Sequence, residues 1–418
     1  MKVVLINHSD SLGGASVVTY RLMEALRGAG VDARMLVTHS TTGSPNVIIG
    51  ATKMQRRIPF LKEHLRIFAR NGMSRSDLFK VSIATDGLPL SRHPLVKGAD
   101  AVILNWVNQG MLSLDEIGRI AAEKPLIWNM HDMWNVTALC HHAGGCDRYT
   151  SHCRHCPLLH GAAGAHDLSY TTFDRKKRLY DSAHITFVAV SSWLEEKARI
   201  SALTRGRHIT MIPNTFDASL FAKPAAYTRT DLGLPDDKKI ILFCAARIDD
   251  PVKNLPLAVE ALNLLADSRG DGCMAVFVGN CKNADALLTL RMPYVHVPLI
   301  SDPERMRAYM AHASVVLSTS HYESFGATLL EGQASGAVPV GLVHDGRADI
   351  IADGISGYAA SPNAISVAEA IGRALARPIP TEDLHRAAAR FDYGNIARKY
   401  IVLLEKLITD NENRHKQV

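Results

Sequence analysis

The chain has 418 residues, of which 47% are hydrophobic and 21% are charged, as in ordinary globular proteins. This length favours two or three domains, and no apolar run reaches the roughly 18 residues that a membrane-spanning helix needs. The net charge of +6 comes without a recognised nucleic-acid-binding motif, so nucleic acid is not an expected partner. The apolar run at 2–7 has strand length and lacks a cleavage site, so no signal peptide is expected and we predict a cytoplasmic protein.

Strand and helix patterns alternate along the whole chain, which predicts doubly wound parallel α/β sheets. In the first half, strand-length apolar runs occupy residues 2–7, 33–38, 100–106, 126–132, 185–192 and 208–214. After a polar stretch near 216–238 the pattern restarts at 240–248, 273–280, 295–299, 314–320 and 338–343. We therefore predict two Rossmann-like domains, 1–215 and 216–395, facing each other across a cleft, with a C-terminal helix at 396–418 crossing back onto the first. In such sheets ligands bind beyond the carboxyl ends of the strands.

Two segments of the first domain carry candidate ligand-binding groups after a strand. Gly13 and Gly14 precede a helix, where paired glycines let backbone amides approach a phosphate; a plain tight turn is the alternative. The third glycine of a dinucleotide fingerprint is missing, which disfavours a nicotinamide cofactor. His131 could donate a hydrogen bond into the cleft, oriented by Asp132 or the backbone, although a purely structural histidine is the alternative.

A basic stretch between residues 54 and 80 contains seven Lys and Arg residues against only two acids, Glu63 and Asp77. Apolar side chains interleave with these cations. Such a stretch could lie on an anionic membrane surface. A helix packed on its own domain, with a solvated basic face, explains the pattern equally well.

Four of the seven cysteines gather within 17 residues, at Cys140, Cys146, Cys153 and Cys156. In a cytoplasmic protein this is not a disulfide framework. Cys153 and Cys156 have the spacing of tetrahedral zinc ligands, and Cys140 with Cys146 could complete four thiolates, so we predict a structural zinc site. Free buried thiols, or a His replacing one thiolate, remain alternatives.

In the second domain, cationic and acidic residues follow the predicted strands in the sequence. Arg247 and Lys253 follow the first strand and could grip a diphosphate, or instead pair with Asp249 or Asp250. Glu323 and Glu331 flank Gly326, which we place at the start of a helix, so that Glu323 lies in a loop and Glu331 about one turn inside. Free amides between two acids suit a ligand with hydroxyls at both ends and phosphate in the middle, such as a sugar nucleotide. A capping Glu323 and a solvated Glu331 are the alternative.

Together these segments resemble family 4 of the retaining glycosyltransferases, which have the two-domain GT-B architecture. The likeness covers nearly the whole chain, in the right order. It is carried by Gly13-Gly14, "HDMW" at 131–134, "IPN" at 212–214, "AARIDDPVKN" at 245–254 and "ESFGATLLE" at 323–331. "HDMW" followed by spaced cysteines looks like the subgroup acting in bacterial capsule, colanic-acid-type exopolysaccharide and O-antigen assembly. Two positions depart from the family pattern: Asn105 stands where a His is expected, and Thr215 where Gly is usual.

The resemblance implies roles for the candidate residues. Glu331 should bind the ribose hydroxyls and Glu323 the hydroxyls of the donor sugar. Arg247 and Lys253 should hold the diphosphate, and His131 should face the transferred sugar. The donor contacts should continue through Ser324, Phe325, Gly326, Ala327 and Thr328, and Gly13 and Gly14 should close on the phosphate. We expect the catalytic residues to be Glu323, His131, Arg247 and Lys253.

We therefore expect a retaining, metal-independent hexosyltransferase. It would move a sugar from a nucleotide-diphosphate donor to a lipid-linked acceptor in bacterial exopolysaccharide or lipopolysaccharide biosynthesis, in peripheral contact with the anionic cytoplasmic face of the inner membrane. No cofactor is expected for catalysis, because no apolar strand ends in D-x-D and the cations replace a catalytic metal ion. The alternatives are a sugar-nucleotide epimerase of similar architecture and a non-catalytic binding module built on the zinc site and the basic stretch.

Overall fold

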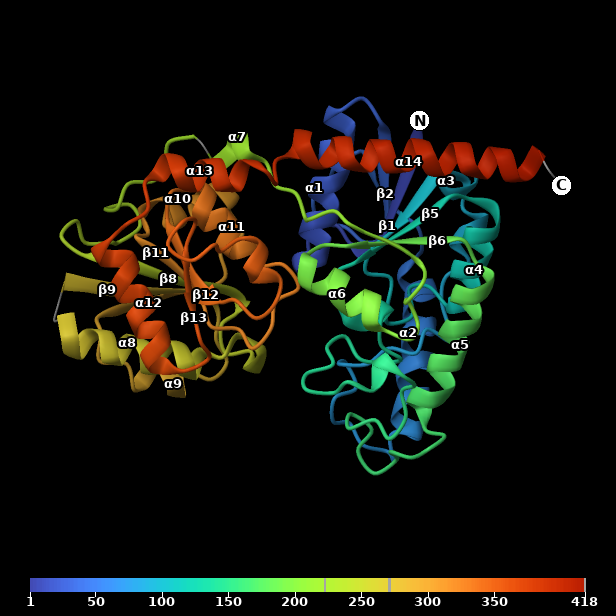
Figure 1. The fold of residues 1–418 in the computed structure, drawn as a ribbon, viewed down its shortest axis with the longest axis horizontal. Coiled ribbons are helices and arrows are strands. Elements are labelled where there is room, and N and C mark those ends of the chain that lie inside the picture. Colours follow the sequence, from blue (N-terminus) through green and yellow to red (C-terminus); the bar gives the residue numbers. More distant parts are fainter. Residues whose placement is uncertain (222, 270–271, 417–418) are drawn as a thin grey trace. The chain divides into compact units, whose positions relative to one another are not determined.

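The computed structural model describes residues 1–221, 223–269 and 272–416, which divide into two compact units (Figure 1). Unit 1 comprises Met1–Thr215 with Tyr393–Val418, and unit 2 comprises Phe216–Asp392. Each unit contains one all-parallel sheet with helices packed on it, which confirms the predicted pair of doubly wound sheets. In the described part of the chain, no helix combines the length and the apolar character needed to cross a bilayer.

The sheet of unit 1 has the strand order β3-β2-β1-β4-β5-β6-β7. Every strand run predicted for this half forms a strand. The short edge strand β3 was not predicted, because three residues carry too little periodicity to recognise. The strands are β1 (Lys2–Ser9), β2 (Asp32–His39), β3 (Val47–Ile49), β4 (Ala101–Leu104), β5 (Leu126–Met130), β6 (Ile185–Ala189) and β7 (His208–Met211).

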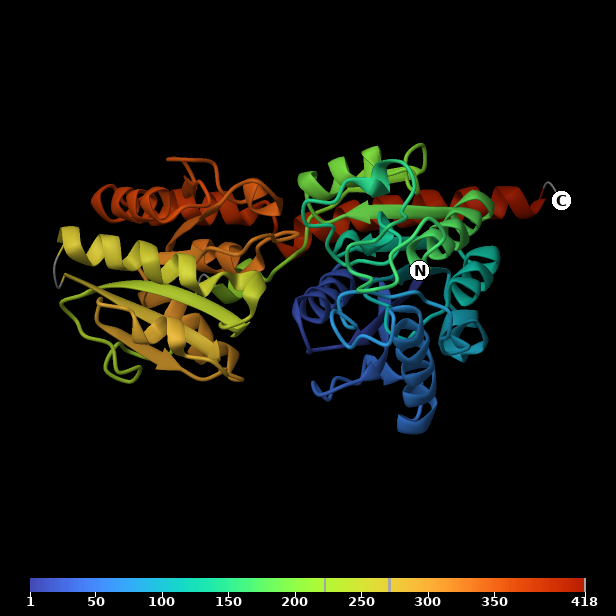
Figure 2. The same ribbon diagram turned by 90° about the horizontal axis from the view of Figure 1, so that it is seen from below.

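Two helices that are far apart in sequence cover one face of this sheet. Leu26 of α1 and Tyr400 and Leu404 of α14 pack in one apolar cluster with Leu5 of β1, and Figure 1 shows α14 beside α1. Helix α2 lies on another side of unit 1, away from α14 (Figures 1 and 2). Helices of unit 1 are α1 (Gly14–Gly28), α2 (Lys53–Arg70), α3 (Pro94–Lys97), α4 (Leu114–Glu123), α5 (Leu168–Ser182), α6 (Ser192–Ile200) and α14 (Tyr393–Lys416). Residues 417–418 of the predicted terminal helix lie outside the described residues.

The sheet of unit 2 repeats this pattern with the order β10-β9-β8-β11-β12-β13. The five predicted strand runs all form strands, and the short strand β13 at the edge was not predicted. The strands are β8 (Lys239–Arg247), β9 (Cys273–Asn280), β10 (Tyr294–Val297), β11 (Val315–Ser318), β12 (Val338–Leu342) and β13 (Tyr358–Ala360). The helices are α7 (Ala218–Phe221), α8 (Leu255–Arg269), α9 (Asp285–Leu288), α10 (Pro303–His312), α11 (Ala327–Ala334), α12 (Ala364–Ala376) and α13 (Thr381–Ala389).

Alternating side chains of the central strands divide between the two faces of this sheet. Phe243 and Val315 point into a cluster with α8 and α12, represented by Leu262 and Ile371. Helices α10 and α11 pack against the sheet on the other side (Figure 1). A strand that is covered on both faces must be apolar along its whole length, which is why these runs are recognisable in the sequence.

Each sheet reverses its strand order next to its first strand. In unit 1 the reversal lies between β1 and β4, and in unit 2 it lies between β8 and β11. The loops leaving two such neighbouring strands diverge to opposite faces, which opens a crevice at their carboxyl ends. The predicted site residues of unit 2 follow β8 and β11, so they stand at this switch point.

Candidate functional site

Glu323 and Lys253 meet at the switch point of unit 2. Lys253 ends the short 3-10 turn Pro251–Lys253 after β8, whereas Glu323 lies in the loop between β11 and α11. Lys253 Nζ donates a hydrogen bond of 2.7 Å to Glu323 Oε1, and Ser320 Oγ donates to the same oxygen at 2.8 Å. The two strands that flank the switch point therefore bring a cation and an acid together.

The Glu323 carboxylate is held in its ionised form. Burial raises its pKa, but the charge of Lys253, the hydrogen bonds from Lys253 and Ser320 and the charge of Arg347 outweigh burial and lower the pKa below its usual value. At neutral pH Glu323 is therefore an acceptor of hydrogen bonds. An ionised carboxylate with one oxygen bound to protein groups can accept from ligand hydroxyls with the other.

A buried ion pair beneath this loop was missed by the sequence analysis. Arg347 and Asp345 are completely or almost completely buried and pair at 2.7 Å. Asp345 Oδ2 accepts a hydrogen bond from the Glu323 amide, and Arg347 donates to the carbonyl of Ser320. These contacts hold both ends of the loop that presents Glu323. The only signal in the sequence was "DGRAD" at 345–349, which two residues separate from the end of β12.

Helix α11 begins at Ala327, as predicted, because Gly326 takes a left-handed conformation with φ of 96°. A Cβ atom at Gly326 would also meet Arg347 Cγ at 3.0 Å, so glycine is needed here for two reasons. The amides of Leu329 and Leu330 bond to the Gly326 carbonyl, whereas those of Ala327 and Thr328 have no acceptor within the described chain. Free amides at a helix start attract anions.

Glu331 lies one turn into α11, as predicted, and is half-buried. It is close enough to act electrostatically on Cys244 of β8: burial raises the pKa of this thiol to about 12, Glu331 adds to the rise and Lys253 opposes it. Arg247, at the end of β8, lies 3.4 Å from Asp249 and 3.5 Å from Asp250. The alternative ion pairs named for Arg247 are thus present, and its contact with a diphosphate stays a prediction.

The predicted glycine pair of unit 1 starts a helix. Gly13, with φ of 86°, is the N-cap of α1, and the amides of Ser16 and Val17 bond to its carbonyl. A Cβ atom on either Gly13 or Gly14 would meet nothing within 4 Å. The surroundings of both glycines are therefore open, so the fold itself does not require the absence of a side chain at Gly14.

His131 belongs to a buried polar network at the carboxyl ends of β4 and β5. His131 Nε2 lies 3.0 Å from Asn105 Oδ1, which also accepts from Asn129 Nδ2 at 2.9 Å, and Tyr400 of α14 donates to Asn129. Since Asn105 Oδ1 is an acceptor, Nε2 carries the proton and Nδ1 is left as an acceptor. Burial lowers the pKa of His131 to about 4, against the opposing charge of Asp132, so the ring is neutral at pH 7.

Asp132 does not orient His131; Asn105 does. Asp132 accepts hydrogen bonds from Trp106 Nε1 at 3.1 Å, from the Trp134 amide and from His141 Nδ1 at 2.7 Å. His141 Nε2 in turn lies 3.2 Å from Ser82 Oγ. This order of Ser, His and Asp resembles that of a hydrolase, but Ser82 is fully buried and cannot reach a substrate, so the chain of bonds braces the loop after β5.

The four clustered cysteines lie in a long irregular segment between β5 and α5. They are free thiols. Burial raises the pKa of Cys140, Cys153 and Cys156, and neighbouring thiols of the cluster add to each rise, so the four cysteines lie within electrostatic reach of one another. Among the described residues, no three His, Cys, Asp or Glu side chains are placed so that they could hold one metal ion. As placed, the thiols do not form a finished ligand set, and zinc binding stays a prediction.

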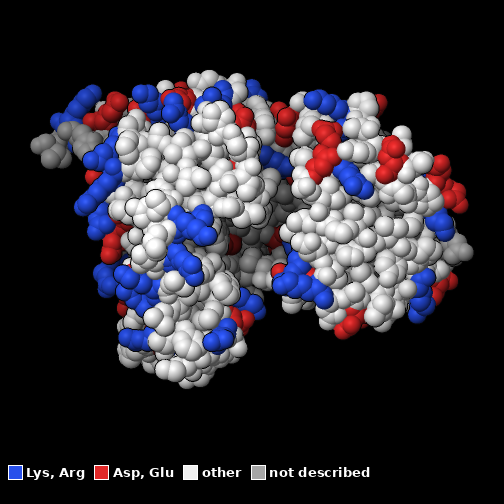
Figure 3. Space-filling model, turned by 180° about the vertical axis from the view of Figure 1, so that it is seen from behind, with Lys and Arg blue, Asp and Glu red and all other residues white. Residues whose placement is uncertain are grey.

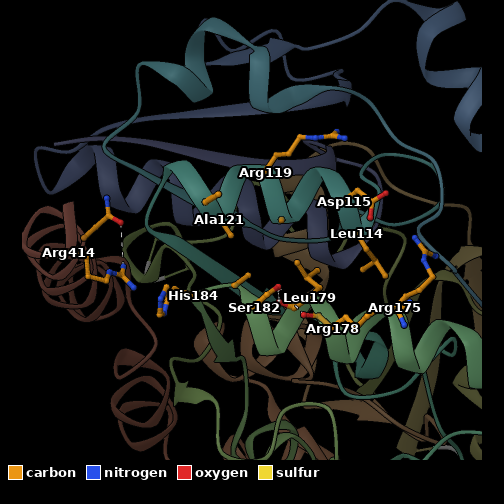
Figure 4. Close-up of a pocket in the computed structure, with 14 residues that line it drawn as sticks. Leu114, Asp115, Arg119, Ala121, Arg175, Arg178, Leu179, Ser182, His184 and Arg414 are labelled. Carbon is orange, nitrogen blue, oxygen red and sulfur yellow. Dashed lines mark hydrogen bonds between the residues drawn. The ribbon is translucent and has the colours of Figure 1, made fainter. Parts of the chain in front are cut away.

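A hollow of about 770 Å³ lies elsewhere in unit 1, between α4, α5 and the end of α14 (Figure 4). Its floor is apolar, with Leu114 and Leu179, and Arg119, Arg178 and Arg414 stand around it. None of the predicted site residues lines it. Arg119 is engaged with Glu116, and Figure 4 shows its side chain pointing away from the floor.

Comparison with known proteins adds a family and a fold. Residues 227–391 match the family model of "Glycosyl transferases group 1". The D-inositol 3-phosphate glycosyltransferase of Arthrobacter sp. (strain FB24) is 26% identical over 83% of this chain and 79% of its own length. Sucrose-phosphate synthase from Thermosynechococcus elongatus has a TM-score of 0.67 at 18% identity, covering 98% of this chain and 99% of that one. Anabaena Alr3699/HepE in complex with UDP and glucose has a TM-score of 0.65 at 16% identity, covering 97% and 100%.

The two parallel sheets and these structural likenesses define a GT-B fold, which confirms the predicted fold class. Residues 227–391 contain Arg247, Lys253, Glu323 and Glu331, so the switch-point site lies inside the matched domain. Residues 227–391 thus match a group 1 glycosyltransferase domain, and most of the chain is similar to a glycosyltransferase. The comparisons do not distinguish subgroups of this domain, so the polysaccharide subgroup predicted from "HDMW" and the cysteines stays a prediction.

Proposed function

We propose that the protein transfers a sugar from a nucleotide-diphosphate donor, with retention of configuration, to a lipid-linked acceptor of a bacterial surface polysaccharide. One observation carries this proposal: Lys253, Glu323 and the free amides of Ala327 and Thr328 converge at the switch point of unit 2. A cation and amides suit a diphosphate, and an ionised acid suits sugar hydroxyls. The structural likeness to a protein in complex with UDP and glucose supports the same class of donor.

The role proposed for each residue follows from the charges that develop during the reaction. Cleavage of the anomeric bond builds negative charge on the leaving diphosphate, which Lys253, Arg247 and the α11 amides would stabilise. Glu323 would hold the donor sugar, and Glu331 the ribose hydroxyls. In the proposed reaction, the acceptor attacks on the face that the diphosphate leaves, and the leaving phosphate takes the acceptor's proton. Gly13, Gly14 and His131 belong to the same proposal because each follows a strand at the carboxyl edge of the unit 1 sheet.

The donor site is tested by nucleotide binding. We expect UDP or GDP to bind in titration calorimetry, and Glu331→Ala to weaken that binding at least about tenfold while the melting temperature is kept. Glu369→Ala, on α12 away from the switch point, is the matched control and should bind as the wild type does. Failure of every nucleoside diphosphate to bind would overturn the proposal and favour the non-catalytic binding module.

The epimerase alternative is separated by a product assay. Incubation of a sugar nucleotide without acceptor should leave the sugar configuration unchanged, apart from slow hydrolysis. An epimerised nucleotide sugar would contradict transfer and support the alternative.

A further inference from the structure

Helix α2 (Lys53–Arg70) is anchored to unit 1 through one face. Its start is fixed by a reciprocal capping pair, Thr52 and Gln55. The buried side chains Pro59, Glu63 and Ile67 recur at the spacing of one helix face. Glu63 accepts hydrogen bonds from the amides of Ile83 and Ala84, at 2.7 and 3.0 Å. These contacts hold the helix by its underside.

The opposite face of α2 is also apolar but is exposed. Met54, Ile58, Leu61 and Leu65 recur at three- and four-residue spacing, so they form one stripe along the helix. Their exposed fractions are 69%, 46%, 51% and 66%. Phe79, which is 65% exposed, lies next to α2, with its ring centroid 5.0 Å from that of His64. An exposed stripe of large apolar side chains on a well-anchored helix marks a contact surface.

Cations border this apolar stripe. Lys53, Arg57 and Lys62 are exposed, and none of them forms an ion pair with any residue that the structure describes. The only acid on α2 is the buried Glu63. Figure 3 views the side of the molecule on which α2 lies, and Lys and Arg side chains there border white, uncharged surface. A hollow of about 480 Å³ next to the stripe is lined by Ile58 and Lys62 together with Arg92.

We propose that the exposed face of α2 docks on an anionic lipid bilayer, with Met54, Ile58, Leu61 and Leu65 entering the interface and the bordering cations contacting lipid phosphates. An apolar stripe edged with positive charge complements a surface that is apolar inside and negative outside. A protein partner would need its own apolar surface edged with negative charge to match this one helix, whereas an anionic bilayer has both properties everywhere. The inference deepens the proposed use of a lipid-linked acceptor, but it stands on α2 alone, so vesicle binding and nucleotide binding can fail separately.

Vesicle sedimentation tests this proposal with the full-length chain. We expect the wild type to bind vesicles of equimolar phosphatidylglycerol and phosphatidylcholine, less so at high salt, and to bind phosphatidylcholine alone weakly. The triple variant Ile58→Ser/Leu61→Ser/Leu65→Ser should bind at least about tenfold more weakly, because three apolar side chains no longer enter the interface. The pair Arg57→Glu/Lys62→Glu should remove the preference for anionic lipid.

The matched control is Leu288→Ser/Ile355→Ser/Ile365→Ser, which replaces three exposed apolar side chains of unit 2. It should bind vesicles as the wild type does. All variants should keep the wild-type melting temperature and nucleotide affinity, since the changed side chains are exposed and lie outside the proposed donor site. Equal vesicle binding by wild type and triple variant would overturn the proposal. The proposal would also be overturned if the wild type did not bind vesicles but was a dimer, and the triple variant was a monomer. A second copy of the chain would then cover the stripe.

Discussion

Lys253 and Glu323 are 70 residues apart in the sequence, yet Lys253 Nζ lies 2.7 Å from Glu323 Oε1. The pair joins the loop after β8 to the loop after β11, across the point where the strand order reverses. Both side chains are partly exposed, 31% and 23%, so the pair itself contributes little to stability. Its importance lies in placing a cation and an ionised acid where a ligand could engage both.

Removing either partner should therefore affect ligand binding more than folding. Lys253→Met and Glu323→Gln are each expected to weaken binding of a diphosphate-sugar donor at least about tenfold, since a charge-assisted contact is lost. The free energy of unfolding should change by less than about 1 kcal/mol. Calorimetry and urea unfolding measure the two effects. Lys239→Met, at the opposite end of β8, is the control, and equal donor affinity in all variants would contradict the prediction.

The stability of the fold should depend on pH through His131. Its folded pKa of about 4 is below the ordinary value of 6.5, so between these values the unfolded chain binds more protons. The free energy of unfolding should therefore fall as the pH drops from 6.5 towards 4, by up to about 3 kcal/mol. His131→Gln lacks this proton and should show a smaller decrease over the same range. Urea unfolding at several pH values measures both slopes, and identical slopes would contradict the lowered pKa of His131.

Gly14 offers a clean test of phosphate approach. An added Cβ would meet no protein atom within 4 Å, and Gly14 is the first residue of α1, so Gly14→Ala should keep or slightly raise stability. If a donor phosphate contacts this amide, the methyl group should instead reduce transfer activity at least about tenfold. Gly28→Ala, at the other end of α1 and also without neighbours within 4 Å, is the matched control. Full activity in Gly14→Ala would remove the glycine pair from the donor site.

The cysteine cluster predicts that the protein binds zinc. We expect protein purified without chelators to contain about one zinc per chain, and removal of the metal to lower the melting temperature. Cys153→Ser and Cys156→Ser should lose the metal, whereas Cys281→Ser in unit 2 should keep it. Metal-free protein with an unchanged melting temperature would leave the four residues as free thiols.

Much of the fold could be predicted from the sequence. Strands covered on both faces must be apolar throughout, so β1, β8 and the other central strands appear as recognisable runs. The short edge strands β3 and β13 could not be predicted, because three residues carry almost no pattern and their pairing is set by neighbours. The sequence also predicted that Glu331 lies in a helix and that Glu323 lies in the preceding loop, because Gly326 marks the helix start.

Side-chain partners could not be predicted in the same way. The sequence analysis named Asp132 or the backbone as the group that orients His131, but His131 Nε2 donates to Oδ1 of Asn105, the residue that follows β4. The buried pair Asp345–Arg347 beneath the Glu323 loop gave no periodic signal. Which side chains form these hydrogen bonds depends on which strands become neighbours in the sheet. That strand order cannot be read from a single sequence.

The amino-acid sequence by itself determined the alternation of strands and helices, the two parallel sheets and the residues that could meet a phosphorylated sugar. These properties are local, because they depend on periodicity, on glycine at a helix start and on the residue types that follow a strand. Tertiary structure alone decided that Lys253 contacts Glu323, that Asn105 holds a neutral His131, and that the apolar residues of α2 divide between a buried face and an exposed one. Burial and distance depend on the packing of elements far apart in the chain. That packing sets the pKa of a charged side chain and decides whether an apolar side chain is buried or exposed.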